Sequence, residues 1–324
     1  MIRLEGINKT FRVARRESGF GRAVRALLSR EYETIHALRD VSFTIGDGEM
    51  VGYIGPNGAG KSTTIKIMCG ILTPDSGKCE INGRTPWRER IAHVRDIGVV
   101  FGQRSQLWWD VPVWDSFDLI RDIYKVDARE YKRNLDELVT LLDLAEILKT
   151  PTRNLSLGQR MRCELAASLL HSPKILFLDE PTIGLDAVSK LAVRQFIKKL
   201  NAERGVTIIL TTHDMQDIEA LTQRILLIGK GRILLDGSLE ELKKSSSQRK
   251  TIVFEYTGKA PALCEGMTTV EQREGRLVVD LEPSICSVSE AIAHISTQVE
   301  VIDISVSGIS AEEMVAGLYR EYHI

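Results

Sequence analysis

One short stretch of the sequence, residues 55–62, has the residue types that hold a phosphate group. Its glycines let the backbone curl so that several N–H groups face one anion, and its lysine adds a positive charge. The hydroxyl after the lysine can ligate Mg²⁺. A strand-like segment precedes the stretch and a helical pattern follows it, as the P-loop motif requires. The predicted phosphate-binding residues are Gly55, Pro56, Asn57, Gly58, Ala59, Gly60, Lys61, Ser62 and Thr63.

Two adjacent carboxylates supply a second element of such a site. The apolar run 175–178 has the character of a buried strand and leads directly into Asp179 and Glu180. In a P-loop protein the first carboxylate holds Mg²⁺, and the second can polarise the attacking water as a general base. Many strands end in Asp-Glu, so this interpretation depends on the P-loop being present in the same chain.

The segments that must position these residues alternate between strand and helix character. Such alternation predicts an α/β fold, here a P-loop nucleotide-binding domain with a mainly parallel sheet. Residues 114–172 show only helical patterns, which predicts a helical subdomain at about 104–172. The strands are expected at 50–54, 98–101, 174–178, 206–210 and 224–228, and the helices at 61–68, 187–200 and 215–221.

A polar, serine-rich stretch at 245–250 divides the chain. It is expected to link a nucleotide-binding domain at 1–244 to a small α+β C-terminal domain at 251–324. That last segment carries 12 acidic and 4 basic side chains, so the net charge of −1 conceals an acidic end and a basic remainder. Its predicted elements are strands at 251–256, 276–281 and 299–306 and helices at 287–296 and 311–322.

Composition excludes several classes of protein. Hydrophobic residues make up 43% and charged residues 27%, a balance typical of globular chains and not of disordered ones. A pI of about 6.6 argues against a nucleic-acid partner. Five scattered cysteines without metal-ligand spacing favour a reduced chain. No apolar run approaches the roughly 18 residues that a membrane span needs.

Four further motifs follow in a characteristic order. Together with the P-loop and the two carboxylates, they resemble the Q-loop, signature, D-loop and switch histidine of the nucleotide-binding subunits of ABC transporters. The resemblance covers residues 1 to about 244. The C-terminal segment is similar to that of type-2 ABC exporter ATPases, including the drug-resistance group. The four motifs are Gln103 after Val-Phe-Gly, residues 155–159 (Leu-Ser-Leu-Gly-Gln), residues 184–186 (Gly-Leu-Asp) and His213 in Thr-Thr-His-Asp.

The resemblance implies two ATP sites, each shared between two chains. In this family two nucleotide-binding domains pack head to tail with ATP and Mg²⁺ between them. Ser156, Gly158 and Gln159 would then contact the γ-phosphate held by the opposite chain, and Asp186 would communicate across the dimer. The catalytic residues implied are Glu180, Gln103 and His213. Of these, His213 would contact the γ-phosphate and Gln103 would reach Mg²⁺ or the attacking water. The implied Mg²⁺ ligands are Ser62, Gln103 and Asp179.

Two features leave alternatives open. Leu157 stands where the commonest signature has glycine, although Gly158 is retained, so a working site is expected. The adenine of ATP normally stacks on an aromatic residue near the end of the first strand. Phe11, expected after a strand at 2–7 and a short turn, is slightly favoured over Tyr32, which lies 23 residues before Gly55.

An insert at about 12–31 is rich in arginine and has apolar residues at helical spacing. It predicts an amphipathic basic helix, which either lies at the membrane surface or packs on its own domain. All four tryptophans lie between positions 87 and 114. In ABC transporters a groove near the Q-loop receives a helix of the permease. Adjacent Trp108 and Trp109 cannot easily both point inward, so at least one should line that groove, whereas Trp114 is expected in the core.

These observations predict an ATP-hydrolysing subunit that powers export through separately encoded membrane permeases. It would work as a homodimer at the cytoplasmic face of the cell membrane, as a peripheral protein. The alternative is a soluble ABC ATPase of DNA maintenance or translation. Against the first, only 53 positions separate Gln103 from Ser156, too few for a long coiled-coil insert, and no CxxC occurs. Against the second, the chain has one P-loop.

Overall fold

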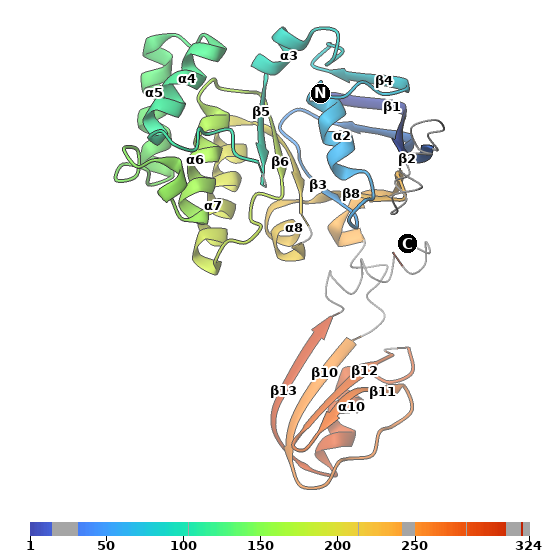
Figure 1. The fold of residues 1–324 in the computed structure, drawn as a ribbon. Coiled ribbons are helices and arrows are strands. Elements are labelled where there is room, and N and C mark those ends of the chain that lie inside the picture. Colours follow the sequence, from blue (N-terminus) through green and yellow to red (C-terminus); the bar gives the residue numbers. More distant parts are fainter. Residues whose placement is uncertain are drawn as a thin grey trace, which may run out of the picture. The chain divides into compact units, whose positions relative to one another are not determined.

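The computed structural model describes residues 1–14, 32–102, 104–212, 214–241, 250–282, 284–308 and 319. They form two compact units, Met1–Asp236 and Gly237–Ile324, each with its own hydrophobic core (Figure 1). No helix among the described residues is long and apolar enough to cross a membrane. All five cysteines are free, and the Sγ atoms of Cys264 and Cys286 lie 3.6 Å apart.

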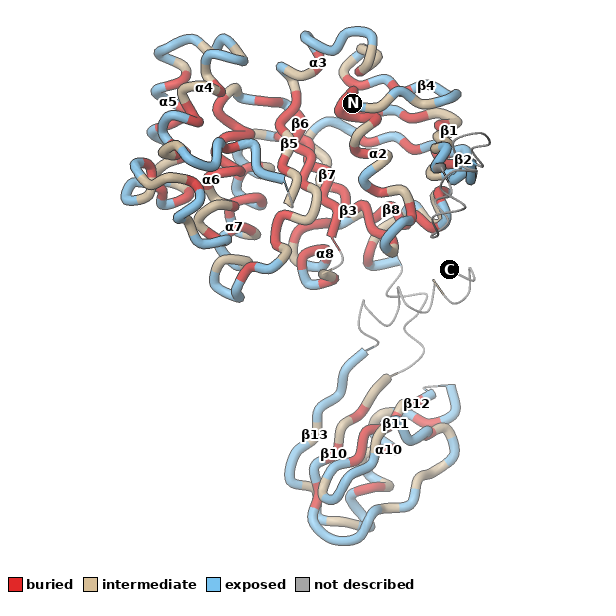
Figure 2. Tube along the Cα trace, viewed as in Figure 1, coloured by how far each residue is buried: buried red, intermediate tan, exposed pale blue. Residues whose placement is uncertain are grey.

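A six-stranded sheet with the order β5-β6-β7-β3-β8-β9 forms the centre of the first unit. The pairings from β5 to β8 are all parallel, which confirms the predicted α/β fold with a mainly parallel sheet. These strands are buried because the sheet is covered on both faces, as Figure 2 shows. The strands are β3 (Met50–Ile54), β5 (Ile97–Phe101), β6 (Ile175–Asp179), β7 (Thr207–Thr211), β8 (Arg224–Gly229) and β9 (Arg232–Ser238).

Helices lie on both sides of this sheet. Figure 1 shows α2 on one side and α6 and α7 on the other, with α4 and α5 beyond α6. The helices of the first unit are α2 (Lys61–Met68), α3 (Arg90–Arg95), α4 (Val113–Tyr124), α5 (Ala128–Leu141), α6 (Leu157–Leu169), α7 (Ala187–Arg204) and α8 (Met215–Leu221), with a short 3₁₀ turn η1 at Thr152–Asn154.

A second, antiparallel sheet in this unit was not anticipated from the sequence. It has the order β2-β1-β4 and consists of β1 (Ile2–Ala14), β2 (Tyr32–Ile45) and β4 (Ser76–Ile81). The predicted end of the first strand near Ile7 is wrong, because pairing with β2 extends β1 to Ala14. Phe11 and Arg12 therefore lie in a strand, not after a turn or in a basic helix. Residues 15–31 of the expected insert lie outside the described residues.

The expected core position of Trp114 is also wrong, since this side chain is 43% exposed. Helix α4 buries Val113, Phe117 and Ile120, which follow the helical spacing of one face. Trp114 comes one residue after Val113 and so turns about 100° away from that face.

The second unit has a four-stranded antiparallel sheet with the order β11-β12-β10-β13. Side chains of β10 and β12 pack with those of helix α10 into a small core, as expected for an α+β domain. The predicted helix at 311–322 lies outside the described residues except for Tyr319. The elements are β10 (Lys250–Thr257), β11 (Met267–Arg273), which was not predicted, β12 (Arg276–Leu281), α10 (Val288–Ser296) and β13 (Glu300–Gly308).

Candidate nucleotide site

The P-loop connects the end of β3 to the start of α2. Gly60 caps the helix with φ of 113°, a backbone conformation that residues other than glycine rarely adopt. A Cβ atom there would also lie 2.7 Å from the carbonyl oxygen of Ala37, so glycine is needed for two reasons. The orientation leaves the first N–H groups of α2 at the loop, where the positive end of the helix dipole favours an anion.

Lys61 places its ammonium group inside this loop. The side chain is buried, and its Nζ donates hydrogen bonds to the carbonyl oxygens of Gly55 (2.6 Å) and Pro56 (3.2 Å). Burial lowers the pKa of Lys61, while the nearby Glu180 and Asp179 carboxylates act in the opposite direction. The lysine charge therefore lies close enough to both carboxylates to act on the same bound group.

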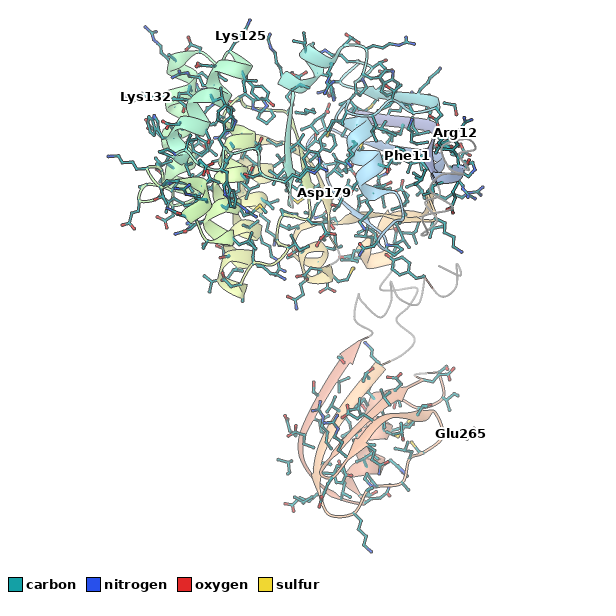
Figure 3. All side chains as sticks on the ribbon, viewed as in Figure 1. Phe11, Arg12, Lys125, Lys132, Asp179 and Glu265 are labelled. Atoms are coloured by element: carbon teal, nitrogen blue, oxygen red, sulfur yellow. The ribbon has the colours of Figure 1, made fainter. Side chains whose placement is uncertain are left out.

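Asp179 ends β6 and is held by two hydroxyl groups. Ser62 Oγ donates to one carboxylate oxygen at 3.3 Å, and Thr211 Oγ1 donates to the other. Figure 3 shows Asp179 at the end of the central sheet. Hydroxyl and carboxylate oxygens are ligands that Mg²⁺ prefers. Among the described residues no group of three His, Cys, Asp or Glu could hold a metal.

Glu180 has a constrained backbone. Its φ of 57° lies in the left-handed region, which non-glycine residues occupy rarely and at an energetic cost. The Glu180 N–H donates to the carbonyl oxygen of Thr211 at 2.9 Å, and the N–H of Gly102 donates to the carbonyl oxygen of Asp179 at 2.8 Å. Neighbouring strands on both sides therefore fix the direction in which Glu180 leaves the sheet.

A cavity of about 520 Å³ joins these groups. Of the predicted phosphate-loop residues it is lined by Pro56, Asn57, Gly58, Gly60, Lys61, Ser62 and Thr63, and both Asp179 and Glu180 also face it. Gly55 and Ala59 shape the loop without lining the cavity. Lining residues that the sequence reasoning missed are Ile35, His36, Ala37, Lys66, Ile71, Phe101, Gly102 and Arg104.

Neither aromatic candidate for adenine stacking lines this cavity. The strand register nevertheless separates them. Phe11 is paired with Ile35, a lining residue, and paired residues of antiparallel strands project from the same face. Tyr32 shares a face of β2 with His36, another lining residue, but it lies four residues away along the strand, roughly 13 Å, where it is 54% exposed. Figure 3 shows Phe11 on β1, in the antiparallel sheet.

The signature residues form the start of α6 and do not line the cavity. Ser156 caps the helix and accepts a hydrogen bond from the N–H of Gln159, whose side chain bonds back to the Ser156 N–H at 2.9 Å. Gly158 is needed within the chain, because a Cβ there would lie 2.4 Å from Ser189 Oγ. The capping box fixes the helix N-terminus, whose dipole could favour a phosphate on another molecule.

Asp186 caps α7 in the same manner and also lies away from the cavity. Its carboxylate accepts hydrogen bonds from the N–H (2.9 Å) and the hydroxyl (2.7 Å) of Ser189. Those bonds lower the pKa of Asp186. Leu157, the departure from the common signature, comes close to the D-loop, since a Cβ on Gly184 would lie 2.9 Å from Leu157 Cδ2.

Gln103 and His213 lie outside the described residues, so their predicted roles are left to experiment. The sequence reasoning assigned no role to two site residues beside them. Arg104 lines the cavity, and Thr211, the first residue of the Thr-Thr-His-Asp motif, bonds Asp179. The available signal for Thr211 was its position at the end of a strand just before Thr-His-Asp, next to the strand that carries the carboxylates.

The sequence is similar to known proteins over this same region. A family model described as "ABC transporter" matches residues 38–183. The daunorubicin resistance ATP-binding protein DrrA3 of Streptomyces coeruleorubidus is 33% identical over 234 residues, which cover 72% of this chain and 73% of that protein. The probable multidrug ABC transporter ATP-binding protein YbhF of Escherichia coli is 34% identical over 222 residues, covering 68% of this chain and 38% of that protein.

A solved structure supports the same assignment. The ATP-binding cassette MJ0796, dimeric in a post-hydrolysis state with ADP and Pi, is 27% identical and has a TM-score of 0.61. The match covers 74% of this chain and 99% of that one. The phosphate loop, the paired carboxylates and these relatives agree, and we conclude that this chain belongs to the family of ABC transporter ATP-binding proteins.

Proposed function

We propose that this protein hydrolyses ATP to power export through separate membrane permeases, as a homodimer at the cytoplasmic face of the membrane. The proposal rests on the observation that the P-loop, Asp179 and Glu180 line one and the same cavity. Export is supported by the drug-resistance and multidrug names of the two relatives. Direct phosphate release from ATP by the full-length chain tests the proposal, and its absence with permease present would reject it.

The proposed roles follow the chemistry of phosphoryl transfer to water. The P-loop N–H groups and Lys61 would hold the β- and γ-phosphates. Ser62 and Asp179, with Gln103, would hold Mg²⁺, which neutralises charge that develops on the phosphate oxygens. Glu180 would orient and deprotonate the attacking water, while His213 would contact the γ-phosphate.

The separation of the signature residues from the cavity supports a dimer. Ser156, Gly158, Gln159 and Asp186 lie at the N-termini of α6 and α7 and do not line the P-loop cavity of their own chain. We propose that they complete the ATP site of a second copy. The dimeric arrangement of the cassette MJ0796 supports this proposal.

Exposed tryptophans support the permease as a partner. Trp108 and Trp109 are 59% and 53% exposed, and adjacent Arg160 stacks its guanidinium 6.0 Å from the Trp109 ring centroid. Large exposed aromatic side chains are typical anchors of protein interfaces. We propose that this pair contacts the permease.

Changing both Trp108 and Trp109 to Ala should leave the isolated subunit folded with a normal ATPase rate. In the assembled transporter it should weaken permease association by about 2 kcal/mol or more. Trp87, which packs against the core, is the matched control, since Trp87→Ala should destabilise the isolated chain by about 3–5 kcal/mol. Thermal melting and copurification with the permease provide the measurements. A large fall in melting temperature of the Trp108/Trp109 variant would disprove the interface role.

The adenine platform has its own test. Because Phe11 shares the face of Ile35, Phe11→Ala should weaken ATP binding by about 1–3 kcal/mol, the value of a lost base–aromatic stack. Tyr32→Ala should have little effect, because its side chain lies four residues along β2 from His36, the lining residue on its face. Nucleotide titration of both variants measures the difference. Weakening by Tyr32→Ala alone would reverse the assignment.

A further inference from the structure

Glu164 is a buried carboxylate that no motif of the family explains here. It lies on α6, two turns after Ser156, and is only 4% exposed. Its side chain accepts hydrogen bonds from the hydroxyl of Ser105 and from the N–H of Gln106 (3.2 Å). The Gln106 side chain also donates to the backbone carbonyl of Glu164 at 3.1 Å. Three bonds therefore tie residues 105–106 to one position of the helix.

Burial raises the pKa of Glu164, and the hydrogen bonds from Ser105 and Gln106 oppose that rise. A buried carboxylate is expensive to desolvate, and an apolar side chain of similar size generally stabilises a fold as well or better. We therefore attribute the presence of Glu164 to the specific hydrogen bonds that its carboxylate makes, and not to a gain in stability. All of those partners belong to one short segment, which starts at the nucleotide cavity.

That segment is attached at three successive points. At its start, the Arg104 N–H donates to the carbonyl oxygen of Phe101 at 2.9 Å, beside Gly102, whose N–H donates to the carbonyl oxygen of Asp179 at 2.8 Å. In its middle, Ser105 and Gln106 bond Glu164. At its end, the Trp108 N–H donates to Ser116 Oγ of α4 at 3.1 Å. The segment thus connects the carboxylate end of β6, helix α6 and the exposed tryptophan pair. Among the described residues, Glu164 is the only carboxylate of α6 that bonds to this segment.

We propose that Glu164 is a positioning residue for ATP hydrolysis, which fixes the segment 104–108 to α6. A shift of α6, whose N-terminus carries Ser156, is then carried to the turn that contacts Asp179. The inference rests on the proposed function, because it assumes that Asp179 and Glu180 hydrolyse ATP. Glu164 does not line the cavity, so it acts on the rate through the segment and not by binding nucleotide.

Glu164→Leu in the full-length chain tests this role. Leucine fills a similar volume but has no acceptor, so the Ser105 hydroxyl and the Gln106 N–H both lose their partner. We expect kcat to fall by about 10- to 100-fold, the effect of misplaced catalytic groups. The KM for ATP should change by less than about twofold, since the P-loop is unaltered.

Two further variants separate positioning from general damage. Cys163→Ala is a buried change on the same helix turn, and Cys163 makes no hydrogen bond to 105–107 among the described residues, so its kcat should equal that of the wild type. Ser105→Ala removes the hydroxyl that donates to Glu164, and it should lower kcat by about 3- to 10-fold. Combined with Glu164→Leu it should add little, because both changes break the same hydrogen bond.

Normal kcat in a folded Glu164→Leu protein would overturn the inference, as would an equal loss in Cys163→Ala. If Glu164→Leu does not fold, Ser105→Ala decides, and wild-type kcat in that variant would overturn it. The proposed function fails separately. It fails if the wild-type chain releases no phosphate from ATP, whereas hydrolysis that depends on Glu180 but not on Glu164 rejects only the positioning role.

Discussion

Replacing Glu180 by glutamine should lower ATP turnover by about 10²- to 10⁴-fold while ATP binding persists, the range for loss of a general base. The change keeps the shape of the side chain. It leaves the backbone bond from the Glu180 N–H to the Thr211 carbonyl oxygen intact, so the strained position at φ 57° is retained. The P-loop, which supplies most phosphate contacts, is also untouched.

Phosphate release, nucleotide titration and light scattering measure the three consequences of this change. Because ATP would remain bound, a dimer should accumulate when ATP is added. Glu203→Gln is a control on the exposed face of α7, where Glu203 lies 3.9 Å from Lys199, and it should leave turnover unchanged. Normal turnover in Glu180→Gln would remove Glu180 from the mechanism.

Local motifs made the phosphate site predictable. The P-loop is a contiguous stretch, and its glycines, lysine and hydroxyl each have a requirement that can be stated without the fold. Asp179 and Glu180 were predictable because an apolar strand leads directly into them. In the structure both motifs line one cavity.

Contacts between distant segments were not predictable. Ile35 lines the cavity because the β1–β2 pairing brings it there, and nothing in its own neighbourhood indicates a nucleotide. The same pairing extended β1 beyond the predicted turn and placed Phe11 within a strand. The expectation for Trp114 was wrong for a different reason. Its helix was predicted, but the face of that helix that would be buried was not, and Val113 and Phe117 occupy that face.

Glycine 102 shows how closely the two carboxylates depend on a neighbouring strand. A Cβ at this position would lie 2.4 Å from the carbonyl oxygen of Glu180 and 2.9 Å from that of Asp179. Both are backbone atoms, so no side-chain rotation can relieve the contact. The end of β5 would have to move away from the end of β6, and the hydrogen bond from the Gly102 N–H to Asp179 would lengthen or break.

Gly102→Ala should therefore destabilise the chain by about 1–3 kcal/mol, as overpacking does. It should also lower kcat by about 10²-fold, because the displaced backbone carries Glu180. Gly46→Ala is the control, since its Cβ would lie 3.5 Å from Glu49 Oε2, an ordinary contact. Thermal melting and phosphate release measure both effects. A normal kcat in Gly102→Ala would show that the close approach of β5 does not set the position of Glu180.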